Sequence, residues 1–205
     1  MSEQLGSLIV VSGPSGVGKS TVCKIVRGNL PDLEFSVSCT TRRPRPGEIH
    51  GREYYFISHE EFESRIADEA FVEYAGVFDN YYGTLKSEVI DRVKAGKDVF
   101  LDIDVQGAMQ IQQAAKNDQL LGKVSEFIFI GPPSLAELER RLRGRGTENA
   151  EQLALRLGKS KTELAYWKKY NYLIINDQVE MAAEKMLSLI NSFRLKTSRM
   201  ADDKF

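Results

Sequence analysis

Cysteine is scarce in this sequence of 205 residues, which contains Cys23 and Cys39 and no others. Because these two are not at a metal-ligand spacing, the sequence predicts neither a disulfide framework nor a cysteine-based zinc site. Long apolar runs are missing too, and residues 1–4 lack the basic and apolar regions of a signal peptide. We therefore expect a cytoplasmic protein, in a reducing compartment, that does not cross a membrane.

An excess of charge of either sign is also absent, since 28 basic residues face 29 acidic ones. This balance argues against nucleic acid or a membrane surface as a partner, so charge has to be interpreted locally. The only histidines, His50 and His59, have no partner at ligand spacing and are interpreted as surface residues. The length suits one domain with a full core and a small inserted lobe. It leaves the oligomeric state open, a homo-oligomer included.

The strongest motif present is GPSGVGKS at residues 13–20, a phosphate-binding loop of the form G-x-x-x-x-G-K-[ST]. It lies between the apolar run 8–11 and a helical pattern, the setting in which the motif has physical meaning. Backbone N–H groups and the helix N-terminus attract polyphosphate, Lys19 reaches the terminal phosphates, and Ser20 is placed to touch Mg²⁺. The alternative is a glycine-rich turn that binds nothing. The predicted ATP-binding residues here are Gly13, Pro14, Ser15, Gly16, Val17, Gly18, Lys19, Ser20 and Thr21.

Apolar runs alternate with helical patterns along the chain, which predicts an α/β fold with a mostly parallel sheet covered by helices. The strand-like runs are residues 8–11, 99–103, 127–130 and 173–175. Residues 35–96 have a different pattern, in which short segments of alternating apolar and polar residues are separated by turn residues. They predict a small, partly antiparallel lobe inserted into the core.

Capping residues predict where three helices begin. Ser58 with Glu61, and Ser134 with Glu137, have the spacing of capping-box pairs. Thr147 is expected to cap a long helix that runs to about residue 168. The last residues, 196–205, are predicted to form a polar tail with little structure.

Two carboxylates, Asp102 and Asp104, stand at the end of the strand-like run 99–103. In a parallel sheet this end lies beside the phosphate loop, so Asp102 is a candidate partner for Mg²⁺, directly or through water. Alternation along the strand turns Asp104 to the same face. The alternative is that both aspartates cap a helix beginning at Val105.

Arginine is concentrated in two segments. Arg42 and Arg45 lie in a stiff, proline-containing loop, where guanidinium groups can clamp a phosphate group. Arg141 and Arg145 belong to a second cluster interrupted by glycines, and Arg156 follows one helix later; glycines beside arginines suit a closing lid. The alternatives are a solvated basic loop for the first cluster and a surface helix for the second.

Together these motifs resemble guanylate kinases of the bacterial nucleotide-kinase type. The resemblance implies a single domain over roughly residues 6–195. Within it, the core would lie at about 6–34, 97–140 and 170–195, a GMP-binding lobe at about 35–96, and a lid at about 141–169. The matching segments, in family order, are GPSGVGKS, SVSCTTRRPRPGEIHGREYYF, VFDNYYGT, LDIDVQGA, GPPS, LRGRGTE and IIND.

The resemblance also implies roles for individual residues, and it places Asn176 near the base of ATP. Thr84 stands where many relatives carry serine, a change that keeps the hydroxyl, and Cys39 replaces a small residue. The residues implied to hold the GMP phosphate are Arg42, Arg45, Tyr54 and Tyr82, and those facing its base are Ser38, Glu73, Thr84 and Asp104. The residues implied to be catalytic are Lys19, Arg42, Arg141, Arg145 and Arg156.

The implied reaction is ATP + GMP to ADP + GDP with Mg²⁺, which Ser20 and Asp102 would hold. Carboxylates at Glu73 and Asp104 complement the N–H donors of guanine, whereas adenine presents an acceptor at N1. One alternative is a kinase of the same fold that acts on another phosphorylated small molecule, such as a ribose bisphosphate. The other is a non-catalytic guanylate-kinase-like module that binds a phosphopeptide, against which the intact phosphate loop argues.

Overall fold

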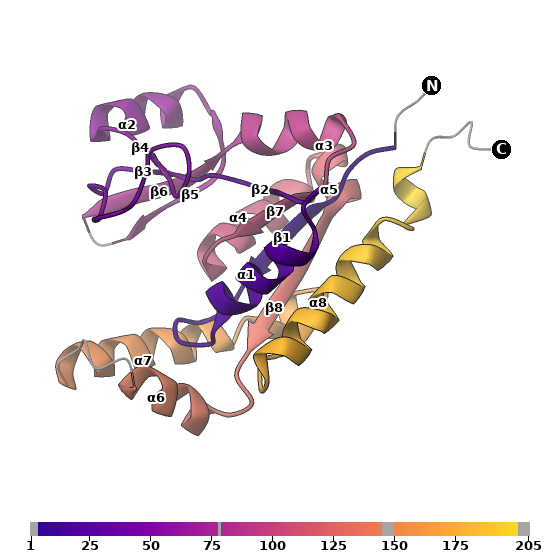
Figure 1. Ribbon diagram of the computed structural model, residues 1–205. Helices are drawn as coiled ribbons and strands as arrows, with labels where there is room; N and C mark the ends of the chain where they lie inside the picture. Colours follow the sequence, from indigo (N-terminus) through magenta and orange to yellow (C-terminus); the bar gives the residue numbers. More distant parts are fainter. Residues whose placement is uncertain (1–3, 78, 145–149, 201–205) are drawn as a thin grey trace.

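A parallel five-stranded sheet forms the centre of the computed structural model, which describes residues 4–77, 79–144 and 150–200 (Figure 1). The strand order is β2-β7-β1-β8-β9, and every described pairing in this sheet is parallel. The α/β prediction is confirmed, and the four predicted strands are present. The strands are β1 (Leu8–Ser12), β2 (Glu34–Phe35), β7 (Val99–Asp102), β8 (Ser125–Gly131) and β9 (Tyr172–Ile175).

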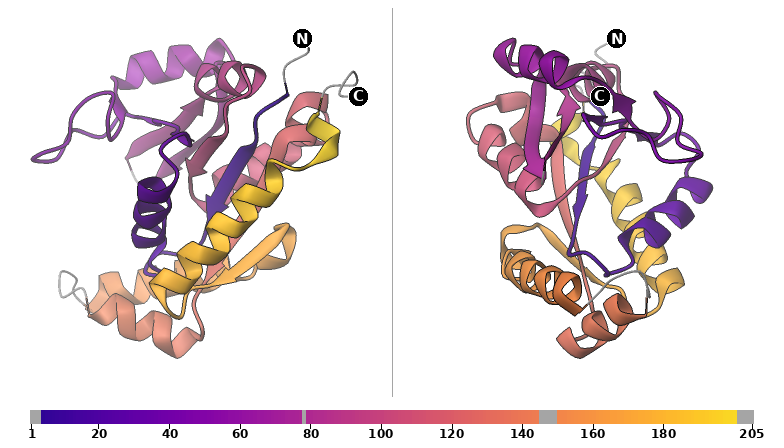
Figure 2. Two further views of the ribbon diagram at one scale, coloured as in Figure 1. Left: turned by 45° about the vertical axis from the view of Figure 1, so that its right-hand side comes forward. Right: turned by 90° about the vertical axis from the view of Figure 1, so that its left-hand side faces the viewer.

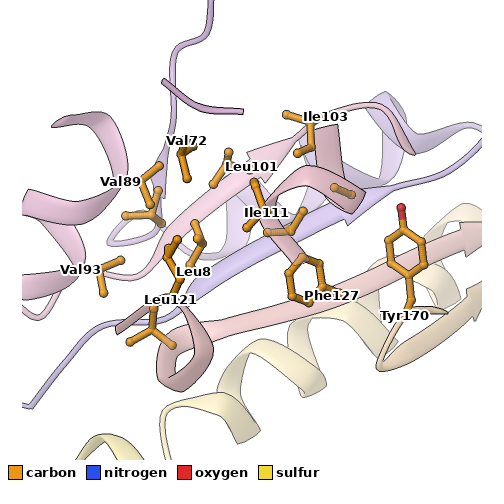
Figure 3. Packing of buried hydrophobic residues seen from close by; sticks show 14 of the residues in the cluster. Leu8, Val72, Val89, Val93, Leu101, Ile103, Ile111, Leu121, Phe127 and Tyr170 are labelled. Atoms are coloured by element: carbon orange, nitrogen blue, oxygen red, sulfur yellow. The ribbon is translucent and has the colours of Figure 1, made fainter. Parts of the chain in front are cut away.

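Helices cover both faces of this sheet because its central strand is apolar on both sides. Ile9 and Val11 of β1 pack against α1 (Lys19–Asn29) and α8 (Val179–Phe193). Leu8 and Val10 face the opposite way, into the cluster drawn in Figure 3. That cluster is completed by α4 (Val105–Ala115), α5 (Gln119–Val124), the π-helical turn η1 (Ser87–Asp91) and α3 (Arg92–Lys94).

The inserted lobe is a second sheet with the order β4-β3-β6-β5. Its strands β3 and β4 pair in parallel, while β3–β6 and β5–β6 are antiparallel, so the expected mixture is present. Phe62 of α2 stacks on Phe71 of β5 with 4.4 Å between the ring centroids. The lobe lies at the opposite end of the molecule from the helices α6 (Leu135–Arg143) and α7 (Ala150–Leu164) (Figures 1 and 2). The lobe elements are β3 (Cys39–Thr40), β4 (Tyr55–Phe56), α2 (His59–Ala67), β5 (Phe71–Val77) and β6 (Asn80–Leu85).

Two of the three predicted helix starts are confirmed by their caps. Ser58 Oγ accepts from the Glu61 N–H at the start of α2, and Ser134 Oγ accepts from the Glu137 N–H at the start of α6 (Leu135–Arg143), both at 3.1 Å. Thr147 lies outside the described residues.

The long helix α7 (Ala150–Leu164) ends earlier than predicted. The next backbone bonds, Ala165 N–H to Thr162 and Tyr166 N–H to Glu163, span three residues and tighten the chain into η2 (Trp167–Lys169). This turn brings Tyr170 onto Phe129, with 5.0 Å between the ring centroids, and leads into β9. Packing of Tyr170 against β8 therefore accompanies the early end of the helix.

Two boundaries of the lobe differ from the prediction. Phe35 was expected in the lobe, but it lies on β2 in the core sheet, where its ring packs on Phe100 at 4.6 Å between centroids. Val89 and Val93 were also placed in the lobe, yet they are fully buried against Leu8 in the core. Apolar side chains at both ends of the insertion join the larger core, which makes the lobe shorter.

The start of the predicted polar tail is attached to the core. Lys196 Nζ pairs with the buried carboxylate of Glu126 at 2.7 Å, and the carbonyl of Arg199 accepts from the Leu5 N–H at 3.1 Å. Lys196 directly precedes the short helix η3 (Thr197–Arg199), and Arg199 is its last residue. Across the described ranges, no helix combines the length and apolar character needed to cross a bilayer.

Candidate active site

The phosphate loop connects β1 to α1 in a conformation that depends on glycine. Gly16 and Gly18 have φ of 86° and 89°, in the left-handed region that residues with a Cβ rarely adopt. A Cβ on Gly18 would also come within 2.6 Å of Asn176 Nδ2. The N–H groups at the start of α1 have no partner within the helix, so this end of α1 presents an anion site.

The side chains of Asn176 and Arg141 bind the backbone of the phosphate loop at Val17. The buried amide of Asn176 donates from Nδ2 to the Val17 carbonyl at 2.7 Å. Arg141 Nη1 donates to the Asn176 carbonyl at 2.9 Å, while its Nε pairs with Glu137 at 2.6 Å. In this structure both side chains therefore stabilise the loop against the end of β9.

A cavity of about 440 Å³ lies between the phosphate loop, the lobe and α7. It brings together segments that are far apart in the sequence. From the loop and the core it is lined by Gly13, Pro14, Ser15, Gly16, Gly18, Lys19, Ser20, Asp102, Ile103 and Asp104; from the lobe by Ser38, Tyr54, Glu73, Ala75, Val77, Tyr82 and Gly83; and from α7 by Lys159 and Glu163.

Asp102, the last residue of β7, and Asp104, two residues later, make different contacts. Asp102 pairs through Oδ1 with Lys19 Nζ, which also donates to the Ile103 carbonyl at 3.4 Å. Asp104 Oδ1 accepts from the Gly107 N–H at 2.9 Å and caps α4. The capping interpretation thus holds for Asp104 and is wrong for Asp102. Burial lowers the pKa of Lys19, although Asp104 is among the charges that oppose this shift.

Glu73 is a buried carboxylate, 6% exposed, at the lobe side of the cavity. Thr84 Oγ1 donates to its Oε1 at 2.6 Å and lies 3.3 Å from Ser38 Oγ. A Cβ on Gly107 would come within 2.5 Å of Glu73 Oε2, so the first turn of α4 approaches this oxygen closely. Burial raises the pKa of Glu73 to about 7, against the effect of the Thr84 hydrogen bond. Thr84 is fully buried behind Glu73 and fixes the carboxylate in place.

In the arginine loop of the lobe, residues 42–48, Arg42 is paired with Glu48, an acid to which the sequence analysis assigned no role. Glu48 accepts from both terminal nitrogens of Arg42 at 2.9 Å and from the Arg45 backbone N–H at 2.7 Å. These hydrogen bonds lower the pKa of Glu48 to about 2. Arg42 also lies 5.5 Å from the ring centroid of Tyr54, which lines the cavity. The guanidinium is therefore beside the cavity, held by a carboxylate of the kind that a phosphate could replace.

A magnesium ion fits the oxygen donors at the loop end of the cavity. Mg²⁺ usually keeps several waters and binds one or two protein groups together with phosphates. Ser20 and Asp102, which carry a hydroxyl and a carboxylate, both line the cavity, and two such oxygen donors suffice for that mode. The described residues contain no cluster of three metal-binding side chains of the His, Cys, Asp or Glu type.

A protein-family model described as guanylate kinase matches residues 6–193. The chain belongs to the guanylate kinase family. It is 50% identical over 198 residues to a guanylate kinase of Clostridium tetani, covering 96% of this chain and 91% of the relative. For a guanylate kinase of Escherichia coli the identity is 44% over 196 residues, covering 95% and 91%.

A solved structure supports the same assignment. The crystal structure of a guanylate kinase from Anaplasma phagocytophilum matches with a TM-score of 0.76 and 32% identity, covering 97% of this chain and 92% of that one. Membership of the guanylate kinase family makes the chain a nucleotide-binding kinase, and it agrees with the two-sheet architecture described above.

Most of the predicted site residues of this guanylate kinase family member meet at the cavity, but some do not line it. Thr84 donates to Glu73, Arg42 lies beside the Tyr54 ring, and Asn176 lies against Gly18, so each adjoins a lining residue. The other predicted site residues outside the described lining are Val17, Thr21, Arg45, Arg141 and Arg156. Arg145 lies outside the described residues. Lys159 and Glu163 belong to no sequence motif, and their spacing of four residues on a helix was the only signal that could have paired them.

Proposed function

We propose that this chain transfers the γ-phosphoryl group of ATP to GMP, forming ADP and GDP, as its family membership implies. The observation that carries the proposal is one cavity lined both by the phosphate loop and by the buried carboxylate of Glu73. A phosphate loop alone would fit many nucleotide-binding proteins. The ionised carboxylate of Glu73 can only accept hydrogen bonds, so its presence in the same cavity adds a binding position for a base with N–H donors.

The ATP side of the proposed site is the loop at residues 13–21. Backbone N–H groups and the α1 N-terminus would bind the phosphates. Lys19 would leave its ion pair with Asp102 and bind the transferring phosphoryl group instead. Mg²⁺, held by Ser20 and Asp102, would supply further positive charge at the β- and γ-phosphates. Asn176 would support this side by fixing Val17.

The GMP phosphate would bind at the lobe. Tyr54 and Tyr82 line the cavity, and the arginine loop lies beside them. Arg42 is bound to Glu48 in a two-point geometry that a phosphate group can also accept. We infer that Arg42 and Arg45 take the GMP phosphate in place of Glu48.

The guanine base would meet Glu73 and Asp104, with Ser38 and Thr84 completing the polar wall. The ionised carboxylate of Glu73 can accept the N1–H and N2–H donors of guanine. Adenine would place an acceptor at N1 against this carboxylate, leaving buried polar groups unpaired. This arrangement favours guanine over adenine.

Transfer itself requires alignment and charge neutralisation more than a strong base, because the GMP phosphate is already ionised. Lys19 would act on the phosphoryl group from the loop. Arg141, Arg145 and Arg156 are proposed to act from the lid segment, with closure excluding water. A cytoplasmic location stays a prediction from the sequence.

A coupled assay of ADP formation tests the proposal. GMP should be the preferred acceptor over AMP, CMP and UMP, and dGMP should be included because no residue is assigned to the ribose 2′-hydroxyl. Activity with a ribose bisphosphate but not with GMP would favour another kinase of the same fold. Phosphopeptide binding without ATP binding would favour the non-catalytic module.

GMP affinity should depend on pH through Glu73. Its pKa is about 7 without nucleotide, and guanine requires the ionised form, so GMP binding should expel a proton below that pH. The apparent affinity should therefore fall as the pH drops from about 8 to 6. Calorimetric titration in buffers of different ionisation enthalpy measures the proton release.

The control for this pH profile is Glu73→Gln, which cannot titrate and leaves only the GMP phosphate itself to respond. A variant profile that coincides with the wild-type profile would show that Glu73 does not bind the base. The raised pKa of Glu73 also affects the free energy of unfolding of the nucleotide-free protein. The folded state binds the Glu73 proton more tightly than the unfolded chain does, so stability should fall as the pH rises from the ordinary carboxyl range towards about 7.

A further inference from the structure

Helix α7 carries two charged side chains that line the same cavity as the phosphate loop. Lys159 Nζ and Glu163 Oε1 lie 3.8 Å apart, one helical turn from each other. The Glu163 side chain is 13% exposed, whereas that of Lys159 is 50% exposed. The Glu163 carboxylate is therefore the more buried of the two charged groups. It belongs to a helix that is part of neither the phosphate loop nor the lobe.

Helix α7 contacts the phosphate loop at Ser15. Ser160 is fully buried, and its Oγ donates to the Ser15 carbonyl at 3.4 Å. The Ser15 backbone N–H lowers the pKa of the Glu163 carboxyl, the direction expected of a donor near the carboxylate. Burial raises the pKa of Glu163, opposed by Lys159, Ser15 and Lys19 and reinforced by Asp104. Ser160 and Glu163 are three residues apart, so one turn of α7 carries both side chains on the face towards Ser15.

A carboxylate in this place has the charge and the acceptor atoms of a phosphate group. Lys19 interacts electrostatically with Glu163, and the lysine of this motif reaches the β- and γ-phosphates of a bound nucleotide. One N–H of Ser15 cannot serve two acceptors fully, and two anions close together repel each other. The terminal phosphate of ATP would therefore compete with Glu163, while ADP has no group at that position.

We propose that Glu163 is a positioning residue that occupies the γ-phosphate end of the phosphate loop in the nucleotide-free protein and is displaced by ATP. The inference rests on the proposed function and deepens it. Displacement breaks a contact between α7 and Ser15, so arrival of the triphosphate loosens the helix from the loop. ADP leaves the contact in place, which makes the position of α7 sensitive to the third phosphate.

The test compares the affinities of Glu163→Gln and the wild type for ATP and for ADP, with Mg²⁺ and without GMP. Loss of one competing charge and hydrogen bond should tighten ATP binding about 3- to 10-fold and change ADP binding less than about 2-fold. Glu139→Gln is the matched control, because it makes the same change on α6, where Glu139 pairs with the exposed Arg143. The control should leave both affinities unchanged. Unchanged or weaker ATP binding by Glu163→Gln would overturn the inference, as would equal tightening of ATP and ADP.

Two further measurements keep the inference falsifiable. Trp167 is the only tryptophan of the chain, follows α7 and is 43% exposed. Its emission should change more with ATP than with ADP in the wild type, and equal responses would contradict displacement. If Glu163→Gln does not fold, Glu163→Asp draws the carboxylate back by one methylene and should tighten ATP in the same direction; no tightening would overturn the inference.

Failure here is distinguishable from failure of the proposed function. A chain that phosphorylates GMP while Glu163→Gln leaves ATP affinity unchanged refutes only the role of Glu163. A chain that shows the expected ATP and ADP affinities but does not phosphorylate GMP refutes the proposed function and leaves the competition at Ser15 intact.

Discussion

Replacing Lys19 by alanine should lower kcat by at least about 10²-fold, the usual cost of removing a charge that stabilises the transition state in a closed site. Lys19 Nζ lies at the end of β7, paired with Asp102 and within 3.4 Å of the Ile103 carbonyl. Water cannot replace an ammonium group held there once the cavity closes. Steady-state kinetics with saturating ATP and GMP measure the effect.

Lys24→Ala is the matched control, since Lys24 is exposed on the same helix, α1. It should leave kcat within about twofold of the wild type, as for surface substitutions away from a site. The fold should survive Lys19→Ala, because Asp102 is 36% exposed and partly exposed pairs contribute only about 1 kcal/mol. A folded Lys19→Ala variant that kept more than about a tenth of wild-type kcat would contradict the proposed role.

Glu73→Gln should lower kcat/KM for GMP by about 10- to 100-fold and reduce the preference for GMP over AMP by a similar factor. The hydroxyl of Thr84 donates to Oε1 at 2.6 Å, so the amide oxygen of the variant would take that position. The amide NH₂ would then stand where the second carboxylate oxygen was. A donor would face the donors of guanine, which leaves them unpaired.

The measurements are kcat/KM for GMP and AMP and the affinity for an ATP analogue. Glu63→Gln, on the exposed side of α2 in the same lobe, is the matched control and should change none of them. Affinity for the ATP analogue should stay within about twofold in Glu73→Gln, as expected for a change confined to the base pocket. Equal losses for both nucleotides would indicate damage to the fold, and an unchanged GMP/AMP ratio would show that Glu73 does not read the base.

Local features of this protein were predictable because their causes lie within a few residues. The phosphate loop is defined by residues 13–20 and their flanks, and glycine at positions 16 and 18 permits the positive φ that the loop adopts. Ser58 and Ser134 cap helices whose first turns are adjacent in sequence. The buried strand β1 reads as an uninterrupted apolar run because helices cover both of its sides.

Boundaries were less predictable, because tertiary packing decides them. The Phe35 ring joins Phe100 rather than the lobe, and α7 stops where the chain must turn for Tyr170 to reach Phe129. Neither partner is near in the sequence. Periodicity shows that a residue is apolar, but it does not show which of two cores receives it.

The sequence by itself determined the α/β fold, the phosphate loop, the acids after β7 and the family, since each depends on short-range pattern or on several motifs in a fixed order. Only the tertiary structure joined Asn176 to Val17 and brought Glu163 to Ser15, contacts between segments more than a hundred residues apart. The physical reason is that backbone preference and burial periodicity are local properties. The pairing of distant polar groups instead follows from how helices and sheets pack, and so from the whole chain at once.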